Sequence, residues 1–161
     1  MPAFVKGGAA RTPFGKNEFL RSTQDVKFES YTCAASTVPA RTIDGNSNQK
    51  VLQPGTVMAK ITSGPEAGKI GPYQAVANGA TAAPVDGRQT AANIVGINDT
   101  FLPWQLIERD VEVGVAYEAS AIQGWCKELD TLGLEIVLSN VTASAMQRGG
   151  AAGKGVDITF K

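Results

Sequence analysis

Acid–base catalysis is the first chemistry to consider, and in this sequence it would rest on carboxylates. The chain has 161 residues and no histidine, which removes histidine-based triads, histidine metal ligands and the commonest general base. Two carboxylate pairs can be drawn, Glu108 with Asp110 and Glu112 with Glu118. The second pair would share the polar face of an alternating strand, where a solvated surface or a contact between subunits is the competing interpretation. We favour that interpretation and expect no enzymatic activity.

Phosphate, metal and thiol chemistry have weaker support in the sequence. The glycine-rich segments 64–69 and 149–155 lack the spacing of a phosphate-binding loop, so we predict a turn and a flexible hinge. Cys33 and Cys126 lie far apart and belong to no Cys-x-x-Cys pair, which argues against zinc binding and thiol exchange. We predict two reduced, buried thiols and no cofactor or metal.

The composition is that of one domain with many turns, because the chain is 43% hydrophobic and contains 18 Gly and 8 Pro. Fifteen acidic and fifteen basic residues cancel, so no global field attracts nucleic acid or an anionic membrane. The expected partner is therefore a protein. No apolar run approaches the roughly 20 residues that span a bilayer, and residues 1–8 lack the apolar core of a signal peptide. We expect synthesis in the cytoplasm.

Residues 1–24 predict an extended N-terminal arm, because glycine and proline alternate there with scattered apolar residues. Four basic residues against the single acid Glu18 could steer this arm to an acidic surface. Its phenylalanines distinguish it from disordered tails, which are poor in aromatic residues, although a solvated terminus is the alternative. The candidate docking residues of the arm are Phe4, Val5, Arg11, Phe14, Phe19 and Leu20.

Residues 25–161 predict a single, mainly β domain. A half-buried strand ends near Thr32, a loop or hairpin follows around 44–48, and short strands are expected at 56–62, 71–75, 93–97 and 110–118. The last strand is the clearest, because valines alternate there with polar or small residues. Strands so closely spaced predict a small antiparallel barrel or sandwich.

The region after Ser120 permits two interpretations. Residues 125–138 could form a helix-like segment or a loop leading into a strand at 134–138, and alternating apolar residues favour the strand. Ser139 or Asn140 would cap a short helix that ends before Gly149, and 156–160 predict a closing strand. One or two short helices are therefore expected.

Two tryptophans are candidates for an interface. The pair Pro103 and Trp104 could anchor a contact with another protein, because tryptophan is enriched at such contacts. A position in the core or at its rim is the alternative, and the same two possibilities hold for Trp125.

Four segments, taken in order, resemble the head decoration protein family of tailed bacteriophages. They are LQPGTVMAKIT at 52–62, KIGPYQ at 69–74, ANIVGI at 92–97 and DVEVGV at 110–115. The resemblance covers roughly residues 51–117, and this chain departs from the shortest family members by its longer front end and by the extension after Tyr117.

The resemblance implies a β-tulip-like domain that forms a homotrimer. It also implies binding to the major capsid protein at threefold and quasi-threefold positions, on the outer surface of an expanded capsid in the virion. The N-terminal arm would become ordered on the capsid, and the protein would act as a cement that stabilises the head.

A small β-barrel module that binds nucleic acid or another ligand is the alternative. Such a module needs a basic face interleaved with aromatic residues. The acids Glu108, Asp110, Glu112 and Glu118 lie together in the strand region and count against it.

Overall fold

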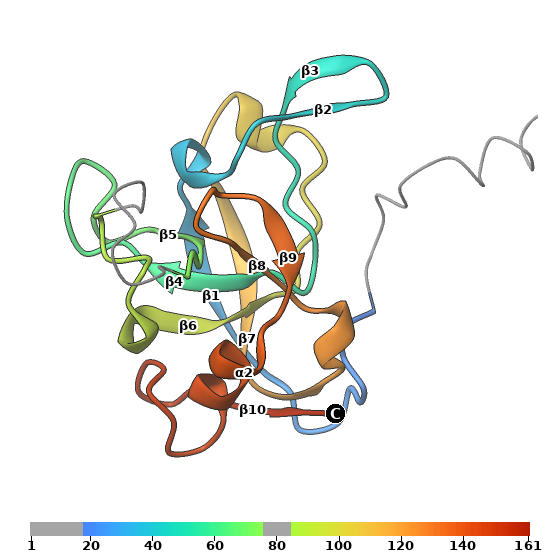
Figure 1. The fold of residues 1–161 in the computed structure, drawn as a ribbon, viewed down its shortest axis with the longest axis vertical. Helices are drawn as coiled ribbons and strands as arrows, with labels where there is room; N and C mark the ends of the chain where they lie inside the picture. The colour runs from blue at the N-terminus through green and yellow to red at the C-terminus, as the bar shows by residue number, and fades with distance from the viewer. Residues whose placement is uncertain (1–17, 76–84) are drawn as a thin grey trace, which may run out of the picture.

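The computed structural model describes residues 18–75 and 85–161 (Figure 1). The expected mainly β fold is confirmed. The strands are β1 Lys27–Cys33, β2 Arg41–Ile43, β3 Asn46–Gln49, β4 Val57–Lys60, β5 Ile70–Pro72, β6 Ile94–Asn98, β7 Val111–Ala121, β8 Lys127–Leu129, β9 Glu135–Val137 and β10 Asp157–Phe160. The helical segments are η1 Ala35–Thr37, η2 Ala91–Asn93, η3 Gln105–Ile107, η4 Gln123–Trp125 and α2 Asn140–Met146.

Hydrogen bonds join five strands into a ring. The large sheet has the order β1-β5-β4-β6-β7-β10, and β1 also pairs with β7. The pairing of β1 with β7 is antiparallel and extends along the whole of β1, whereas β1 meets β5 at one register position, Cys33 opposite Ile70. The ring is therefore closed firmly on one side of β1 and at a single point on the other.

A β-bulge at Tyr117 divides β7 into two halves. Lys27 of β1 lies opposite Glu118, and Phe28 lies opposite Ala116, so Tyr117 is the extra residue. A bulge shifts the alternation of side chains by one residue. The predicted alternation holds before the bulge, where Val113 and Val115 are buried.

Two hydrophobic clusters lie on opposite sides of the ring strands. Met58 of β4 packs in one cluster with Cys33, Ile70 and Val115, whereas its neighbours Val57 and Ala59 pack in the other. Successive residues of a strand point to opposite faces. The cluster with Met58 therefore fills the interior of the ring and is called the inner cluster. The cluster with Val57 and Ala59 lies between the ring and the segments that follow β7, and is called the outer cluster.

The C-terminal third of the chain covers the outer cluster. The hairpin of β8 and β9, helix α2 and strand β10 lie side by side at this face (Figure 1). The side chain of Ser139 caps α2 by accepting a hydrogen bond from the N–H of Thr142, and Gly149 has φ +78° after the helix. The predicted cap, helix, strand at 134–138 and closing strand are all confirmed.

The burial expected for β1 is wrong. The strand was predicted to bury one face, yet its residues from Lys27 to Ser30 are exposed, and Phe28 is 48% exposed. Alternation indicates that a strand has two different faces, but what covers a face is decided by distant segments. Here residues 18–26 lie beside Phe28 and leave about half of its side chain exposed.

Candidate binding surface

The predicted arm divides into two parts. Phe4, Val5, Arg11 and Phe14 lie outside the described residues. Phe19 is 1% exposed and packs in the outer cluster, so its predicted role as a docking anchor is wrong.

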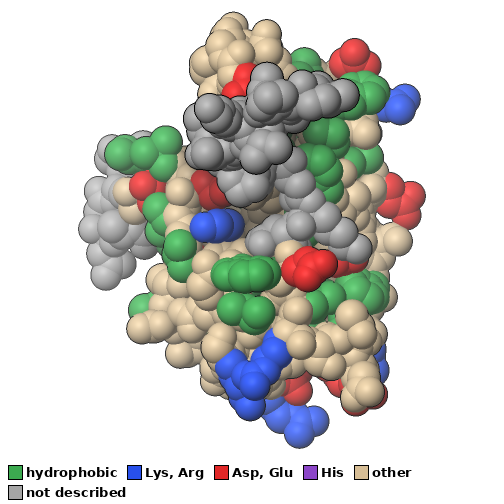
Figure 2. All heavy atoms as spheres, turned by 90° about the vertical axis from the view of Figure 1, so that its right-hand side faces the viewer, with side chains coloured by type: hydrophobic (Ala, Val, Ile, Leu, Met, Phe, Trp, Pro, Cys, Tyr) green, Lys and Arg blue, Asp and Glu red, His purple; other side chains and the backbone are tan. Residues whose placement is uncertain are grey.

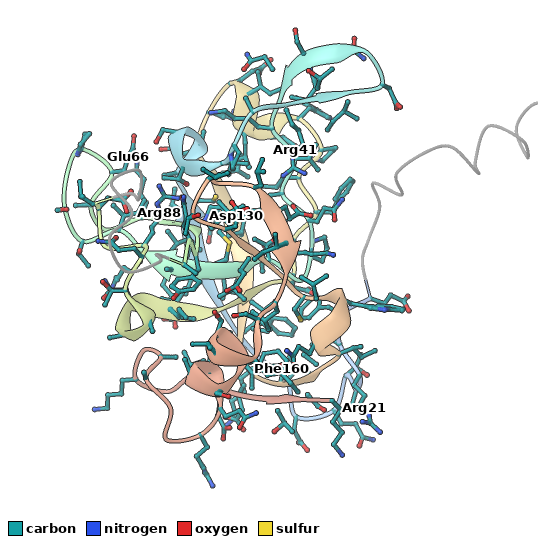
Figure 3. The ribbon with its side chains drawn as sticks, in the orientation of Figure 1. Arg21, Arg41, Glu66, Arg88, Asp130 and Phe160 are labelled. Carbon is teal, nitrogen blue, oxygen red and sulfur yellow. The ribbon has the colours of Figure 1, made fainter. Side chains whose placement is uncertain are left out.

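Residues 19–21 belong to the folded body because they pair with the end of β7. Leu20 forms a bridge with Ala121, the N–H of Arg21 donates to Ser120 at 2.9 Å, and the N–H of Ile122 donates to Phe19 at 2.8 Å. Figure 3 shows Arg21 at the same end of the molecule as Phe160. The boundary at residue 24 is thus too late for an arm, and the folded body has begun by Phe19.

The segment before β7 presents Trp104 at the surface. Leu106 of η3 is fully buried in the inner cluster and fixes this segment to the ring. Trp104 is 56% exposed and Ile107 is 38% exposed, while Pro103 is half-buried. A core position for Trp104 is therefore excluded, and its role at an interface stays a prediction.

A larger set of exposed apolar side chains lies on and beside the β8–β9 hairpin, and sequence reasoning named only Trp125 among them. This hairpin surface extends over both faces of β9. It consists of Trp125, Leu132, Leu134, Ile136, Val137 and Val141, each of them at least 39% exposed. Figure 2 shows hydrophobic side chains at several places on one face of the molecule. The signal in the sequence was the consecutive pair Ile136 and Val137, because such a pair gives both faces of a short strand apolar side chains.

Hydrogen bonds and a salt bridge fasten the hairpin at its turn and to β2. One carboxylate oxygen of Asp130 accepts from the N–H of Leu132 at 2.9 Å and from that of Leu134 at 2.8 Å, which fixes the turn. Arg41 of β2 forms a salt bridge with Glu135 of β9, with 3.2 Å between the charged atoms. The exposed apolar side chains are thus displayed on an ordered support.

The carboxylates considered for acid–base chemistry have other partners or positions. Glu112 and Glu118 stand on opposite sides of the bulge at Tyr117, so they do not share a face as predicted. Glu118 instead forms a salt bridge of 2.7 Å with Lys27.

Asp110 is engaged in holding loops together. Its carboxylate contacts the ammonium group of Lys69 and accepts from the N–H of Ala35 at 2.8 Å. The hydrogen bond from Lys69 and the one from Ala35 hold the pKa of Asp110 below its ordinary value of 3.8. Glu108, the other member of the pair that the sequence allowed, is exposed.

Both thiols are free and buried, as predicted. Burial raises the pKa of Cys33 and of Cys126 to about 12, which disfavours the nucleophilic thiolate at neutral pH. In the described part of the chain, no group of three or more Cys, Asp or Glu residues is arranged to hold a metal ion. No helix found there has the length and apolar character to cross a membrane.

A groove of about 300 Å³ opens beside β1. Its walls include Glu29 and Tyr31 of β1, Lys60 at the end of β4, Tyr117 of β7 and Lys154. The hydroxyl of Tyr31 donates to Glu29 at 2.8 Å, and partial burial together with this bond raises the pKa of Tyr31 to about 12. The groove thus combines two phenols, two ammonium groups and one carboxylate.

No family model, curated protein or solved structure matches this chain. The resemblance to head decoration proteins therefore stays a prediction from the four sequence segments.

Proposed function

We propose that this protein is a structural component of a virion, which binds the outer surface of an expanded phage capsid as a homotrimer and stabilises the lattice of the major capsid protein. The observation that carries the proposal is the hairpin surface, with Leu132 at 76% and Leu134 at 60% exposure. Large apolar side chains gathered on an ordered support are typical of protein–protein contact sites.

The positions of the four resembling segments support the capsid as the partner. Segment 52–62 contains β4, 69–74 contains β5, 92–97 contains most of β6, and 110–115 begins β7. In the ring these strands follow one another in the order β5-β4-β6-β7. The resemblance thus falls on one continuous part of the fold.

The proposed stabilisation is a binding linkage. A protein that binds the expanded lattice and no other state of the capsid shifts the equilibrium towards that lattice, by an amount set by its concentration and affinity. The rigid hairpin lowers the entropic cost of docking, because Asp130 and Arg41 already fix its conformation. A trimer would add avidity, because its second and third contacts are intramolecular.

The test is co-sedimentation of the purified protein with expanded capsids that lack their decoration. The full chain is expected to bind stoichiometrically, and a chain without residues 1–17 is expected to bind more weakly. The deletion stops before Phe19, because removing that buried side chain would damage the fold. If the full chain does not bind expanded capsids, the proposal is wrong.

A matched pair of substitutions tests the hairpin surface. Val137→Glu places a charge on it, where Val137 is 50% exposed, whereas Val85→Glu makes the same change at a position 88% exposed and outside the hairpin surface. We expect Val137→Glu to weaken capsid binding while Val85→Glu leaves it unchanged. Equal binding by both variants would remove the hairpin surface from the interface.

The alternative function, a nucleic-acid-binding module, has one observation in its favour. Tyr31 and Tyr117 lie with Lys60 and Lys154 in the same groove, and aromatic rings between basic groups suit single-stranded nucleic acid. The carboxylate of Glu29 in that groove would repel a polyanion and so weakens this alternative. A salt-sensitive gel shift of single-stranded DNA at micromolar protein would support this alternative over the capsid.

A further inference from the structure

Strand β1 uses one of its two edges for β7. The backbone N–H and C=O of Gly114 in β7 point away from β1. The N–H donates to the hydroxyl of Thr100 and the carbonyl accepts from the N–H of Asp99, both at 2.9 Å. Hydrogen-bonding direction alternates along an antiparallel pair. The backbone groups of Val113 therefore form hydrogen bonds with Tyr31 of β1, and those of Val115 form hydrogen bonds with Glu29.

The same alternation points three residues of β1 the other way. Phe28, Ser30 and Thr32 direct their N–H and C=O groups towards the edge opposite β7. On that edge, β5 reaches β1 only at its end, where Cys33 lies opposite Ile70: the N–H of Ala34 donates to Ile70 at 2.9 Å, and the parallel register turns the N–H of Ile70 to the carbonyl of Thr32. Among the described residues, Phe28 and Ser30 have no strand partner on this side, and both are exposed.

The groove lies along this edge and gives it chemical character. Glu29 and Tyr31 of β1 form one wall, and Lys60 and Lys154 stand in the other walls. The carboxylate of Glu29 already accepts the hydroxyl of Tyr31. Two ammonium groups against one engaged carboxylate favour an acidic side chain in the groove.

We propose that an extended, acidic segment of the capsid partner adds a strand to β1, by pairing with Phe28 and Ser30. Main-chain hydrogen bonds supply the affinity in this mode of recognition, and a pocket for alternate side chains supplies the specificity. The identity of the partner rests on the proposed function, whereas the existence of the free edge rests on the strand pairing alone.

A second copy of this chain is a poorer occupant. Among the described residues, the other strand edges that carry an exposed or half-buried acid are β9, with Glu135, and β10, with Asp157. Glu135 already contacts Arg41, and Asp157 lies 3.5 Å from the guanidinium group of Arg148. A neighbouring copy would therefore offer only acids that already contact arginine to the groove.

Ser30→Pro tests the edge with little disturbance of the fold. Proline removes the N–H that points outward and keeps the bonds of Glu29 and Tyr31 to β7, and proline is tolerated at a strand edge that faces solvent. Ser30→Ala is the matched control, because it removes the hydroxyl and retains the N–H. In co-sedimentation with expanded capsids, we expect Ser30→Pro to bind about tenfold or more weakly and Ser30→Ala to bind like the wild type.

The outcomes separate this inference from the proposed function. If the wild type binds capsids and Ser30→Pro binds equally well, the strand addition is wrong and the capsid function stands. If the wild type does not bind, the proposed function fails. If Ser30→Pro instead dissociates an oligomer in sedimentation velocity, the edge joins copies of this chain and the capsid assignment is overturned.

A measurement on the wild type covers the case in which Ser30→Pro does not fold. Hydrogen exchange at the amides of Phe28 and Ser30 is expected to slow when capsids are added. Unchanged exchange at these two amides in the bound state would overturn the inference.

Discussion

The carboxylate of Glu128 accepts hydrogen bonds from the hydroxyl of Thr142 and from the N–H of Ser139, the latter at 3.0 Å. Glu128 belongs to β8 and is 1% exposed, while Ser139 and Thr142 form the beginning of α2. One buried side chain thus joins the hairpin that carries the exposed apolar residues to the helix that follows it.

Glu128→Ala is expected to lower the free energy of unfolding by about 2–4 kcal/mol, because it leaves buried donors without their acceptor and removes core volume. Urea denaturation followed by circular dichroism measures this. Glu112→Ala, at an exposed position, serves as the control and should change the stability by less than about 0.5 kcal/mol. Equal stability of the two variants would show that the Glu128 contacts contribute nothing.

Acid should weaken the link between Asp110 and its partners. Lys69 and the N–H of Ala35 hold the pKa of Asp110 in the folded state below 3.8. The stabilisation is therefore complete when the pH is above the pKa of Asp110 in the unfolded state. It is lost as the pH falls through the lower pKa of Asp110 in the folded state. We expect the difference in Tm between the wild type and Asp110→Asn to be constant near neutral pH and to shrink below about pH 4. A difference that did not vary with pH would contradict this account.

The free protein should show alternating amide exchange along β1. Glu29 and Tyr31 bond to β7 and should exchange slowly, whereas Phe28 and Ser30 point to the free edge and should exchange fast. Hydrogen–deuterium exchange monitored by nuclear magnetic resonance resolves the four amides. Uniform protection would mean that the edge is already occupied in the free protein.

Gly96 should tolerate no side chain. Its φ is +144°, and a Cβ atom there would stand 2.2 Å from the carbonyl oxygen of Ala116 in the neighbouring strand. Gly96→Ala is expected to destabilise the protein by about 2 kcal/mol or more, because backbone must move. Gly124→Ala, where nothing lies within 4 Å, should be close to neutral in the same thermal denaturation. Similar melting of the two variants would argue against the close approach of β6 and β7.

The strands were predictable where the local pattern is strong. Val113 and Val115 alternate with polar or small residues, and β7 forms there. The bulge at Tyr117 carries no local signal, since neither glycine nor proline marks it. It arises from the register between β7 and the distant β1.

The candidate site was less predictable, because it depends on long-range contacts. Phe19 is buried because its neighbours pair with Ala121 and Ile122, about a hundred residues further along the chain. Leu134 and Ile136 alternate as if they faced a core, yet β9 lies at an edge and leaves them exposed. Apolar patterning alone does not distinguish a buried face from a binding face.

The bridge between Leu20 and Ala121 also determines how the body responds to mechanical tension. Ala121 lies opposite Phe160 on its other side, so the first and last described segments are both attached to the end of β7. A force applied between positions 18 and 161 would therefore pass through these attachments and not through the ring. Under such a pull, β10 and residues 19–21 would detach first, and the ring of five strands would carry no load until they had done so.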